Sequence, residues 1–370
     1  MFARLLLPVL LTGSIASTAA SQTVASPAAV PVEPIAAIID AFRSHSVVAL
    51  PDAHGNEQRH AFLVSLIRDP RFAATVNDIV VEFGSARYQD VIDRFSRGED
   101  VPYASLRMVW QNITMGHGAA DYPINEDFFR AVRSVNASLP REHRLRVLLG
   151  DPPIDWDDVH TREDHFKWIA MRDSYPAALI QTEVLARERK ALLVYGELHF
   201  QRKQVMANYE MEDWRAQTIV SILEHNTPTK VFTIWGADDR AAAVQGDVSS
   251  WRAPSLAVVR GTSLGAADFA VFSSFSSTAT RFAVRGGQLM PLSRDDWRSL
   301  RAEEQFDAVL YLGPSSAMTQ SRLPPTLCRD PAYIEMRLHR IALAGPKVEA
   351  DRLQQYCAAL SPKSSGSQDR

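Results

Sequence analysis

Histidine and carboxylate side chains follow several short apolar runs in this sequence, at the points where the runs end. His54, Glu82 and His199 each follow a different run. Four more acidic residues stand in the same position: Asp52, Asp151, Glu197 and Asp238. When such groups are buried together, their pKa values move apart, and a site can then hold one acid and one base at neutral pH. The same residue types also bind divalent metal ions.

The apolar runs have the character of buried strands. They are continuous rather than alternating, as expected for strands covered on both faces of a sheet. The expected strands span residues 47–50, 79–81, 145–149, 191–195 and 230–235, with two similar runs at 256–260 and 308–312. In open α/β sheets, ligands bind beyond the carboxyl ends of the strands. A lone histidine there is more often structural, but repetition after several strands favours a functional site.

Helical stretches separate these runs. The helices are expected at residues 57–68, 126–139 and 161–189. Asn125 is the expected N-cap of the second. Thr161 is the expected N-cap of the third, with Asp164 at the capping-box position, and Pro176 is expected to kink or divide that helix.

Strand and helix in alternation predict an α/β fold with a mostly parallel central sheet and helices on both faces. One domain over residues 35–360 is expected. The segment Val101–Tyr122 has no clean period and predicts a helical or loop insert. Such an insert beside strand ends is either a lid or pocket wall, or a surface excursion packed by its own aromatic side chains.

Four short stretches resemble the erythromycin esterase and ChaN-like superfamily, which is related to TraB/Tiki proteins. They are residues 47–55, 80–84, the pair Arg172-Asp173, and 193–200. His54 with Gly55 matches the family's motif after the first strand, Glu82 the acidic residue after the second, and His199 the later histidine. The resemblance covers about residues 47–199.

The sequence departs from the family pattern at two places. Asp52 stands where the family has a glutamate before the first histidine. The segment Leu149–Trp156, which contains Asp151 and Asp155, has no counterpart in the esterase pattern and suggests a separate bacterial subgroup. Erythromycin is therefore not implied as the substrate.

The resemblance implies metal-independent hydrolysis of an ester bond in a small molecule. His54 is the implied general base on water, oriented by Asp52 or Glu82, while His199 and Arg172 stabilise the oxyanion or assist the leaving group. The residues expected to bind substrate or support the site are Asp52, Asp151, Asp155, Asp173 and Glu197.

Two other interpretations use the same residues. His54, Glu82 and His199 suit a divalent zinc, manganese or iron site that activates water. Alternatively, the strand-end histidines contact haem or another small ligand in a binding protein without catalytic activity. Glycine-rich phosphate loops after the first strand and the His-Glu-x-x-His pattern are missing from the sequence.

The ends of the chain predict export. Arg4 precedes an apolar run over residues 5–17, and small residues lead to an expected cleavage after Ala20. Residues 21–34 are an expected extended lead-in and 361–370 a disordered tail. Cys328 and Cys357 predict either a disulfide or two buried free thiols. We expect a periplasmic or secreted protein without stable membrane insertion after signal removal, and the net charge of −3 gives no case for nucleic-acid binding.

Overall fold

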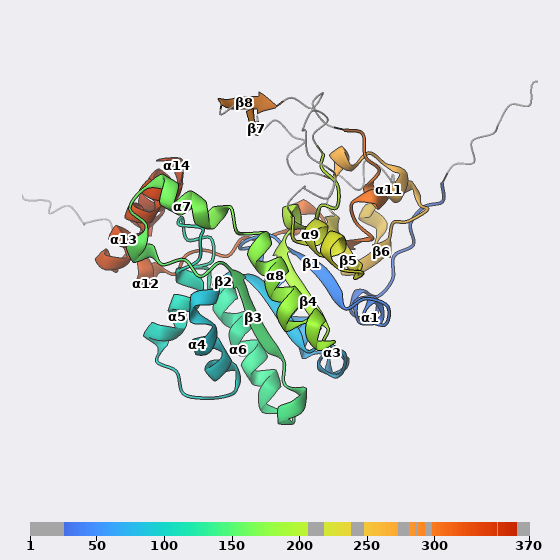
Figure 1. The fold of residues 1–370 in the computed structure, drawn as a ribbon, viewed down its shortest axis with the longest axis horizontal. Helices are drawn as coiled ribbons and strands as arrows, with labels where there is room; N and C mark the ends of the chain where they lie inside the picture. Colours follow the sequence, from blue (N-terminus) through green and yellow to red (C-terminus); the bar gives the residue numbers. More distant parts are fainter. Residues whose placement is uncertain are drawn as a thin grey trace, which may run out of the picture.

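The central element is a seven-stranded, mostly parallel sheet with the strand order β3-β2-β4-β1-β5-β9-β6. The computed structural model describes residues 26–205, 218–237, 248–272, 281–285, 288–292, 298–345 and 347–360. The strands of the sheet are β1 (Val47–Asp52), β2 (Asp78–Ser85), β3 (Arg146–Asp151), β4 (Ala191–Gly196), β5 (Val231–Ala237), β6 (Ser255–Val258) and β9 (Ala308–Tyr311). Only the edge strand β6 runs antiparallel to its neighbour within this sheet (Figure 1). All seven predicted strands and the α/β class are confirmed.

Each strand carries apolar side chains on both faces, so the sheet separates two cores. In β1, Val48 and Leu50 pack on one side. Val47 and Ala49 pack on the other. Because both faces are covered, the strands have continuous apolar runs, as the sequence indicated.

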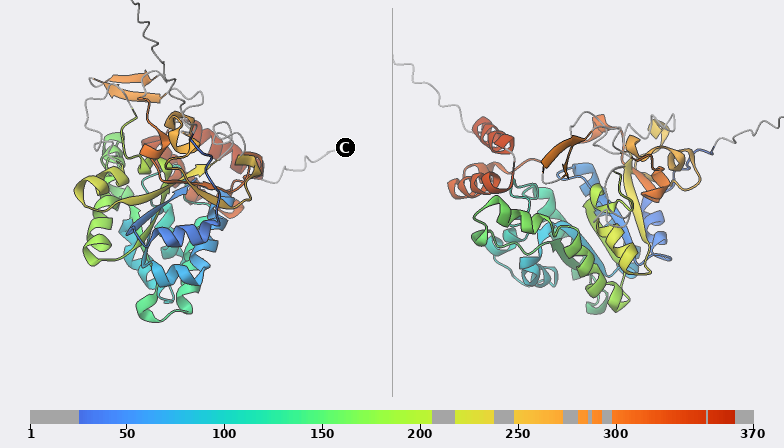
Figure 2. Two further views of the ribbon diagram at one scale, coloured as in Figure 1. Left: turned by 90° about the vertical axis from the view of Figure 1, so that its right-hand side faces the viewer. Right: turned by 45° about the horizontal axis from the view of Figure 1, so that its top comes forward.

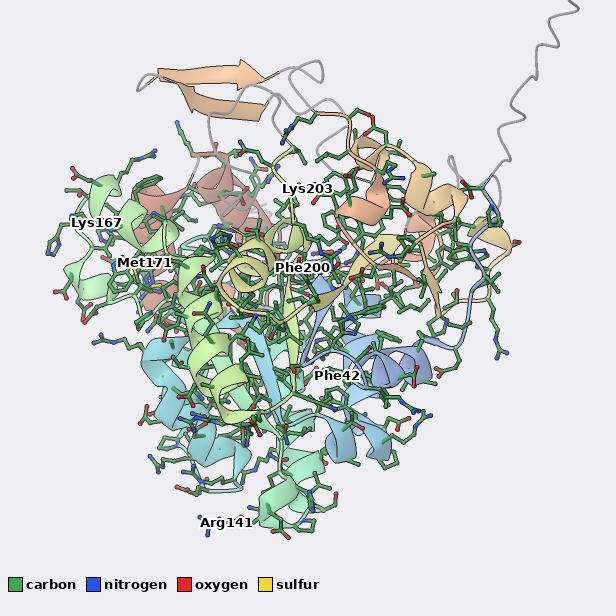
Figure 3. All side chains as sticks on the ribbon, turned by 45° about the vertical axis from the view of Figure 1, so that its right-hand side comes forward. Phe42, Arg141, Lys167, Met171, Phe200 and Lys203 are labelled. Carbon is green, nitrogen blue, oxygen red and sulfur yellow. A yellow bond between two sulfur atoms is a disulfide. The ribbon has the colours of Figure 1, made fainter. Side chains whose placement is uncertain are left out.

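Helices cover both faces (Figures 1 and 2). The first face is covered by α1 (Pro34–Ala41), α2 (Glu57–Arg68), α3 (Pro70–Thr75), α4 (Gln89–Ser96), α5 (Tyr103–Gln111) and α6 (Pro123–Ala137). The second face is covered by α8 (Ser174–Glu183), α9 (Ile219–Asn226) and α11 (Ser263–Ala266). Figure 3 shows Phe42 and Phe200 within the molecule, whereas Arg141 and Lys167 project from it. The prediction of helices on both faces is confirmed.

The start of the second predicted helix differs from the prediction. Helix α6 begins at Pro123, because proline is well suited to the first helical turn. Asn125 is therefore inside the helix rather than its N-cap, and its side chain donates to Ala120 O. The lead-in ends where α1 begins at Pro34. The segment Val101–Tyr122 contains α5, in agreement with the predicted helical or loop insert.

The long helical zone divides before Pro176 rather than at it. Helix α7 (Arg162–Ile169) begins with the predicted capping box of Thr161 and Asp164. Helix α8 begins at Ser174, so Pro176 lies in its first turn, where a backbone N–H has no helical partner to lose. The break therefore falls at residues 170–173, which places Arg172 and Asp173 between two helices.

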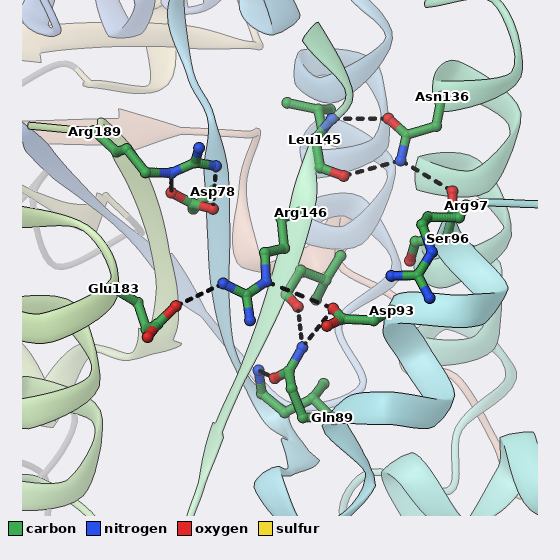
Figure 4. Close-up of polar contacts among 12 residues, drawn as sticks. Asp78, Gln89, Asp93, Ser96, Arg97, Asn136, Leu145, Arg146, Glu183 and Arg189 are labelled. Atoms are coloured by element: carbon green, nitrogen blue, oxygen red, sulfur yellow. Dashed lines mark hydrogen bonds and ion pairs between the residues drawn. The ribbon is translucent and has the colours of Figure 1, made fainter. Parts of the chain in front are cut away.

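The amino ends of β2 and β3 are fixed by polar contacts at the edge of the sheet opposite the strand-end histidines (Figure 4). Arg189 makes two hydrogen bonds to the buried carboxylate of Asp78, at 2.6 and 2.7 Å. The Asn136 amide group pairs with both the N–H and the carbonyl of Leu145. These bonds satisfy buried polar groups where the strands begin and fix their register.

The C-terminal helices pack beside α7 (Figure 1). They are α12 (Pro325–Cys328), α13 (Pro331–Ala344) and α14 (Lys347–Leu360). The buried Arg337 of α13 pairs with the buried Asp121 at 2.6 Å and donates to Gln111 O. Cys328 and Cys357 form a disulfide, which confirms that alternative over free thiols.

A separate two-stranded antiparallel sheet consists of β7 (Arg281–Arg285) and β8 (Gln288–Leu292). Within the described ranges, no helix combines the length and the apolar character that crossing a membrane requires.

We predict that replacing both cysteines by serine lowers the free energy of unfolding by about 3 kcal/mol, because the disulfide closes a loop of 29 residues and restricts the unfolded chain. Urea unfolding followed by circular dichroism measures the change. Treating the native protein with reductant should produce the same loss, and treating the double variant should produce none. Equal stability of the two proteins would contradict the prediction.

Candidate active site

The strand order brings the predicted residues together. Strands β2, β4 and β1 are neighbours and parallel, so their carboxyl ends meet at one edge of the sheet. Asp52 ends β1 and His54 follows it, Glu82 lies near the end of β2, and His199 lies in the short turn of 3-10 helix after β4. The convergence that the sequence predicted is therefore present in the fold.

Glu82 lies at the centre of this group. Its side chain is only 2% exposed. One carboxylate oxygen, Oε2, accepts a hydrogen bond from the Gly196 N–H at 2.7 Å. The other, Oε1, contacts the Arg172 guanidinium and lies 3.7 Å from His54 Nε2 and 3.6 Å from His199 Nε2. Three cationic side chains thus face a single oxygen atom.

Each histidine is oriented by its own aspartate. His54 Nδ1 lies 2.9 Å from Asp52 Oδ2, and His199 Nδ1 lies 2.7 Å from Asp173 Oδ1. Asp173 is held in turn by the N–H of Ile219 at the start of α9. An aspartate on Nδ1 turns Nε2 toward the reacting side, which is the arrangement that orients a catalytic imidazole.

The electrostatics favour protonated imidazoles. Burial disfavours the charged form, but Glu82 and Asp52 outweigh it and raise the pKa of His54 to about 9. Burial acts in the same way at His199, where Asp173 and Glu82 raise the pKa to about 9. Burial alone would raise the pKa of Glu82, but the surrounding cations hold it well below its usual range. At neutral pH the group is therefore a carboxylate surrounded by cations.

The loop that carries His54 is held by a distant segment. Ser321 N–H donates to Gly55 O at 2.7 Å, and Gln320 donates to the His54 carbonyl. Gly55 has a φ of +80°, and an added Cβ would lie 2.3 Å from the Gln320 amide nitrogen. Only glycine combines this backbone conformation with the close approach of that segment.

Asp151 joins the group through Arg172. Its Oδ1 lies 4.0 Å from Arg172 Nε. Thr114 donates to its two oxygens from the backbone N–H at 2.7 Å and from the hydroxyl at 2.6 Å. Burial raises the pKa of Asp151 to about 7, against the opposing effects of Arg172 and Thr114. Arg172 thus lies between the ionised carboxylate of Glu82 and the carboxyl group of Asp151, which titrates near neutral pH.

Two predicted supporting residues lie in other contacts. Asp155 pairs with Arg87 at 2.6 Å. Glu197 accepts from Arg59 and from the Gly236 N–H, both at 2.9 Å, and so links the end of β4 to β5. Asp238 lies outside the described residues.

The sequence reasoning missed other members of the site. Thr114 lies in the insert, where no local pattern links it to Asp151. The N–H of Gly196 has no signature beyond its position after a strand. Tyr195 of β4, whose ring contacts the His199 ring edge-on at a centroid distance of 5.5 Å, reads from sequence as an ordinary strand residue.

One further pattern belongs to a different region. Residues 261–265 have the spacing Gly-x-Ser-x-Gly, which in α/β-hydrolases carries a nucleophilic serine between a strand and a helix. Here the preceding strand β6 is antiparallel, and its end at Val258 pairs with Ala308 at the beginning of β9. Ser263 therefore lies at the opposite edge of the sheet from the histidines, where its N–H donates to Pro27 O.

A metal ion fits this site poorly, although the ligand types are suitable. Ligand atoms of Asp52, His54 and Glu82 lie within 4.8 Å of one another. This set differs from the predicted metal ligands His54, Glu82 and His199, because Asp52 takes the place of His199. However, the Arg172 guanidinium contacts the Glu82 oxygen that a cation would need. The neighbours of Glu82 already supply the positive charge that compensates it, so a metal ion is not needed for that purpose.

Comparison with known proteins gives distant structural likenesses. No protein-family model matches the chain, and neither does any curated protein. A Bacillus cereus protein of known crystal structure is similar with a TM-score of 0.45 and 10% identity, over 80% of this chain and 97% of that chain. A succinoglycan biosynthesis protein gives a TM-score of 0.47 and 11% identity, over 80% and 96%.

ChaN of Campylobacter jejuni, whose structure has cofacially bound haem, is more distant. Its TM-score is 0.34 with 13% identity, over 54% of this chain and 84% of that chain. These likenesses concern the course of the chain alone.

We predict that Glu82→Gln lowers the pKa of both His54 and His199 from about 9 toward the ordinary value near 6.5, because the carboxylate charge that favours both imidazolium forms is lost. NMR titration of the histidine ring protons measures the shift. The matched control is Glu197→Gln, which removes a carboxylate paired with Arg59 and should leave both values unchanged. Equal titration curves in wild type and Glu82→Gln would refute this account of the site.

The same shifts predict the pH dependence of stability. A histidine whose pKa is higher in the folded than in the unfolded protein stabilises the fold fully below about pH 6.5, and the contribution is lost as the pH rises through about 9. The free energy of unfolding of the wild type should therefore fall over this range. Glu82→Gln should flatten that fall, as urea unfolding at stepped pH would measure.

Proposed function

We propose that the protein is a hydrolase that cleaves an ester bond in a small molecule without a metal ion. The observation that carries this proposal is the pair of Asp–His dyads whose Nε2 atoms face one carboxylate oxygen of Glu82, at 3.7 and 3.6 Å. Two such imidazoles near one reacting centre can divide the work of base and acid between them. The distant likeness to ester-hydrolysing families in the sequence motifs agrees with this assignment.

His54 is the proposed base, because its side chain is 34% exposed whereas that of His199 is 14% exposed. In the active form His54 is neutral. Its Nε2 takes a proton from water as the water oxygen bonds to the ester carbonyl carbon. Asp52 stabilises the imidazolium that forms.

His199 is the proposed acid. It remains protonated when His54 is neutral, and its Nε2 gives a proton to the alkoxide as the bond between the carbonyl carbon and the alkoxy oxygen breaks. Arg172, fixed between Glu82 and Asp151, supplies positive charge for the oxyanion of the tetrahedral intermediate. The products are a carboxylic acid and an alcohol, and transfer of a proton from His54 to His199 restores the starting state.

A metal-dependent hydrolase is the second candidate, favoured only by the spacing of Asp52, His54 and Glu82. Haem binding, the third interpretation from the sequence, requires an imidazole nitrogen that is free and neutral. In both histidines Nδ1 faces an aspartate and Nε2 faces Glu82, with the pKa raised to about 9. A general base can act through the small neutral fraction of His54, whereas a resident haem ligand has to stay neutral, so the residues fit haem less well than they fit acid–base catalysis.

We also propose that the protein works outside the cytoplasm. The disulfide between Cys328 and Cys357 supports this location, because structural disulfides persist in oxidising compartments. The apolar N-terminal run is the second support.

We predict that kcat/KM for an ester substrate rises up to tenfold per pH unit between pH 7 and about 9. Glu82 and Asp52 outweigh the effects of burial and Arg172 and raise the pKa of His54 to about 9. At pH 7 only about 1% of His54 is therefore in the neutral form that can act as a base. Steady-state kinetics with p-nitrophenyl and alkyl esters measures the profile. A plateau already reached at pH 7 would show that His54 is not the base.

His54→Ala should lower kcat/KM by about 10²–10⁴-fold, the usual contribution of a general base. His60→Ala, which removes a histidine of α2 outside the cluster, is the matched control and should retain most activity. Chelator should leave the wild-type rate unchanged. Loss of activity with chelator and recovery with a divalent ion would replace this mechanism by the metal-dependent one.

A further inference from the structure

Tyr195 has a buried hydroxyl with no partner. The residue is 1% exposed and lies one position before Gly196, whose N–H bonds Glu82. Within the described part of the chain, its hydroxyl oxygen makes no hydrogen bond. A buried hydroxyl without a partner costs about 1–3 kcal/mol, so the fold tolerates it only where something is gained.

The ring of Tyr195 contacts the site, and its hydroxyl lies beside Gly150, the residue before Asp151. Tyr195 and Glu82 belong to neighbouring strands, and the Tyr195 ring meets the His199 ring edge-on at an angle of 78°. Burial, with the nearby carboxylates of Glu82 and Asp151, raises the pKa of Tyr195 well above its ordinary value. The hydroxyl therefore keeps its proton and remains a hydrogen-bond donor.

Gly150 of β3 makes room for this hydroxyl. A Cβ at position 150 would lie 2.0 Å from the Tyr195 oxygen and 3.0 Å from Cζ. Any residue other than glycine would push the hydroxyl out of its place. The sequence thus combines a tyrosine on one strand with the absence of a side chain on another.

We propose that the Tyr195 hydroxyl donates a hydrogen bond to an oxygen atom of the bound substrate, which in the proposed reaction is the carbonyl oxygen of the ester. This inference rests on the proposed function. The bond strengthens as that oxygen gains charge in the tetrahedral intermediate, so Tyr195 complements Arg172 in stabilising the oxyanion. Because the hydroxyl is enclosed, substrate binding has to open a path to it.

The variant Tyr195→Phe tests the inference by separating stability from activity. It removes only an oxygen that has no partner in the free protein, so the free energy of unfolding should stay equal or rise. With an ester substrate, kcat should fall on the order of 10²-fold, as for the loss of one oxyanion donor, with a smaller change in KM. An unchanged kcat would overturn the inference. A clear loss of stability would overturn it as well, because it would show that the hydroxyl bonds a resident water.

Tyr333→Phe is the matched control with the opposite pattern. The Tyr333 hydroxyl donates to the buried carboxylate of Asp121, which pairs with Arg337. Its removal should lower the free energy of unfolding and change kcat less than about twofold.

A measurement without turnover keeps this inference separate from the hydrolase proposal. The probe is phenyl methylphosphonate, a tetrahedral anion that resembles the intermediate of ester hydrolysis. By calorimetry, Tyr195→Phe should bind it at least tenfold more weakly than wild type. Equal affinity would overturn the role of Tyr195 while leaving ester hydrolysis intact.

The remaining outcomes are also decisive. Weaker binding by Tyr195→Phe together with no turnover of any ester by wild type would support the hydroxyl as a ligand donor and reject the reaction. If wild type neither binds the phosphonate nor hydrolyses an ester, both proposals are wrong.

Discussion

The buried carboxylate of Glu82 is the constraint on which the site depends. An ionised carboxylate inside a protein is costly unless cations and hydrogen-bond donors compensate it. Here the compensation comes from Arg172, His54 and His199 on one oxygen and from a backbone N–H on the other. The position of each partner follows from this requirement, because removing any of them would leave buried charge uncompensated.

The cations that compensate Glu82 are themselves held by carboxylates. Asp52 and Asp173 each orient one imidazole, and Asp151 faces Arg172. The charges of Arg172, His54 and His199 are matched by the carboxylates of Asp52, Glu82 and Asp173, and Asp151, with its pKa raised by burial to about 7, adds negative charge as the pH rises. The nearby carboxylates explain why both imidazoles favour their charged forms despite burial. Because charges of both signs are present, the net charge of the site stays small.

Much of this arrangement could be predicted from the sequence because it depends on local patterns. Continuous apolar runs identify buried strands, and the rule that parallel strands end at one edge brings His54, Glu82 and His199 together. The break between α7 and α8 was misplaced because proline is tolerated in a first turn as well as at a kink.

Other features depend on contacts between distant residues. Thr114 bonds Asp151 from 37 positions away, and Gln320 bonds the His54 carbonyl from 266 positions away. No local periodicity indicates either contact. The direction of the histidine pKa shifts could not be predicted from the sequence either. Burial lowers each pKa and the charge of Glu82 raises it, and the outcome depends on the distances of 3.7 and 3.6 Å between Glu82 and the two imidazoles. The role proposed for His54 therefore requires alkaline pH to be filled by most molecules.

The two sides of the site are supported by one C-terminal region. Residues 319–321, which precede α12, hold the His54 loop by backbone and side-chain hydrogen bonds. On the other side, Arg337 and Arg340 of α13 donate to Gln111 O, three residues before Thr114, which holds Asp151 beside Arg172. The disulfide links α12 to α14 and so ties the first and the last helix of this region together. Order in these helices therefore supports the position of the His54 loop on one side and of Asp151 on the other.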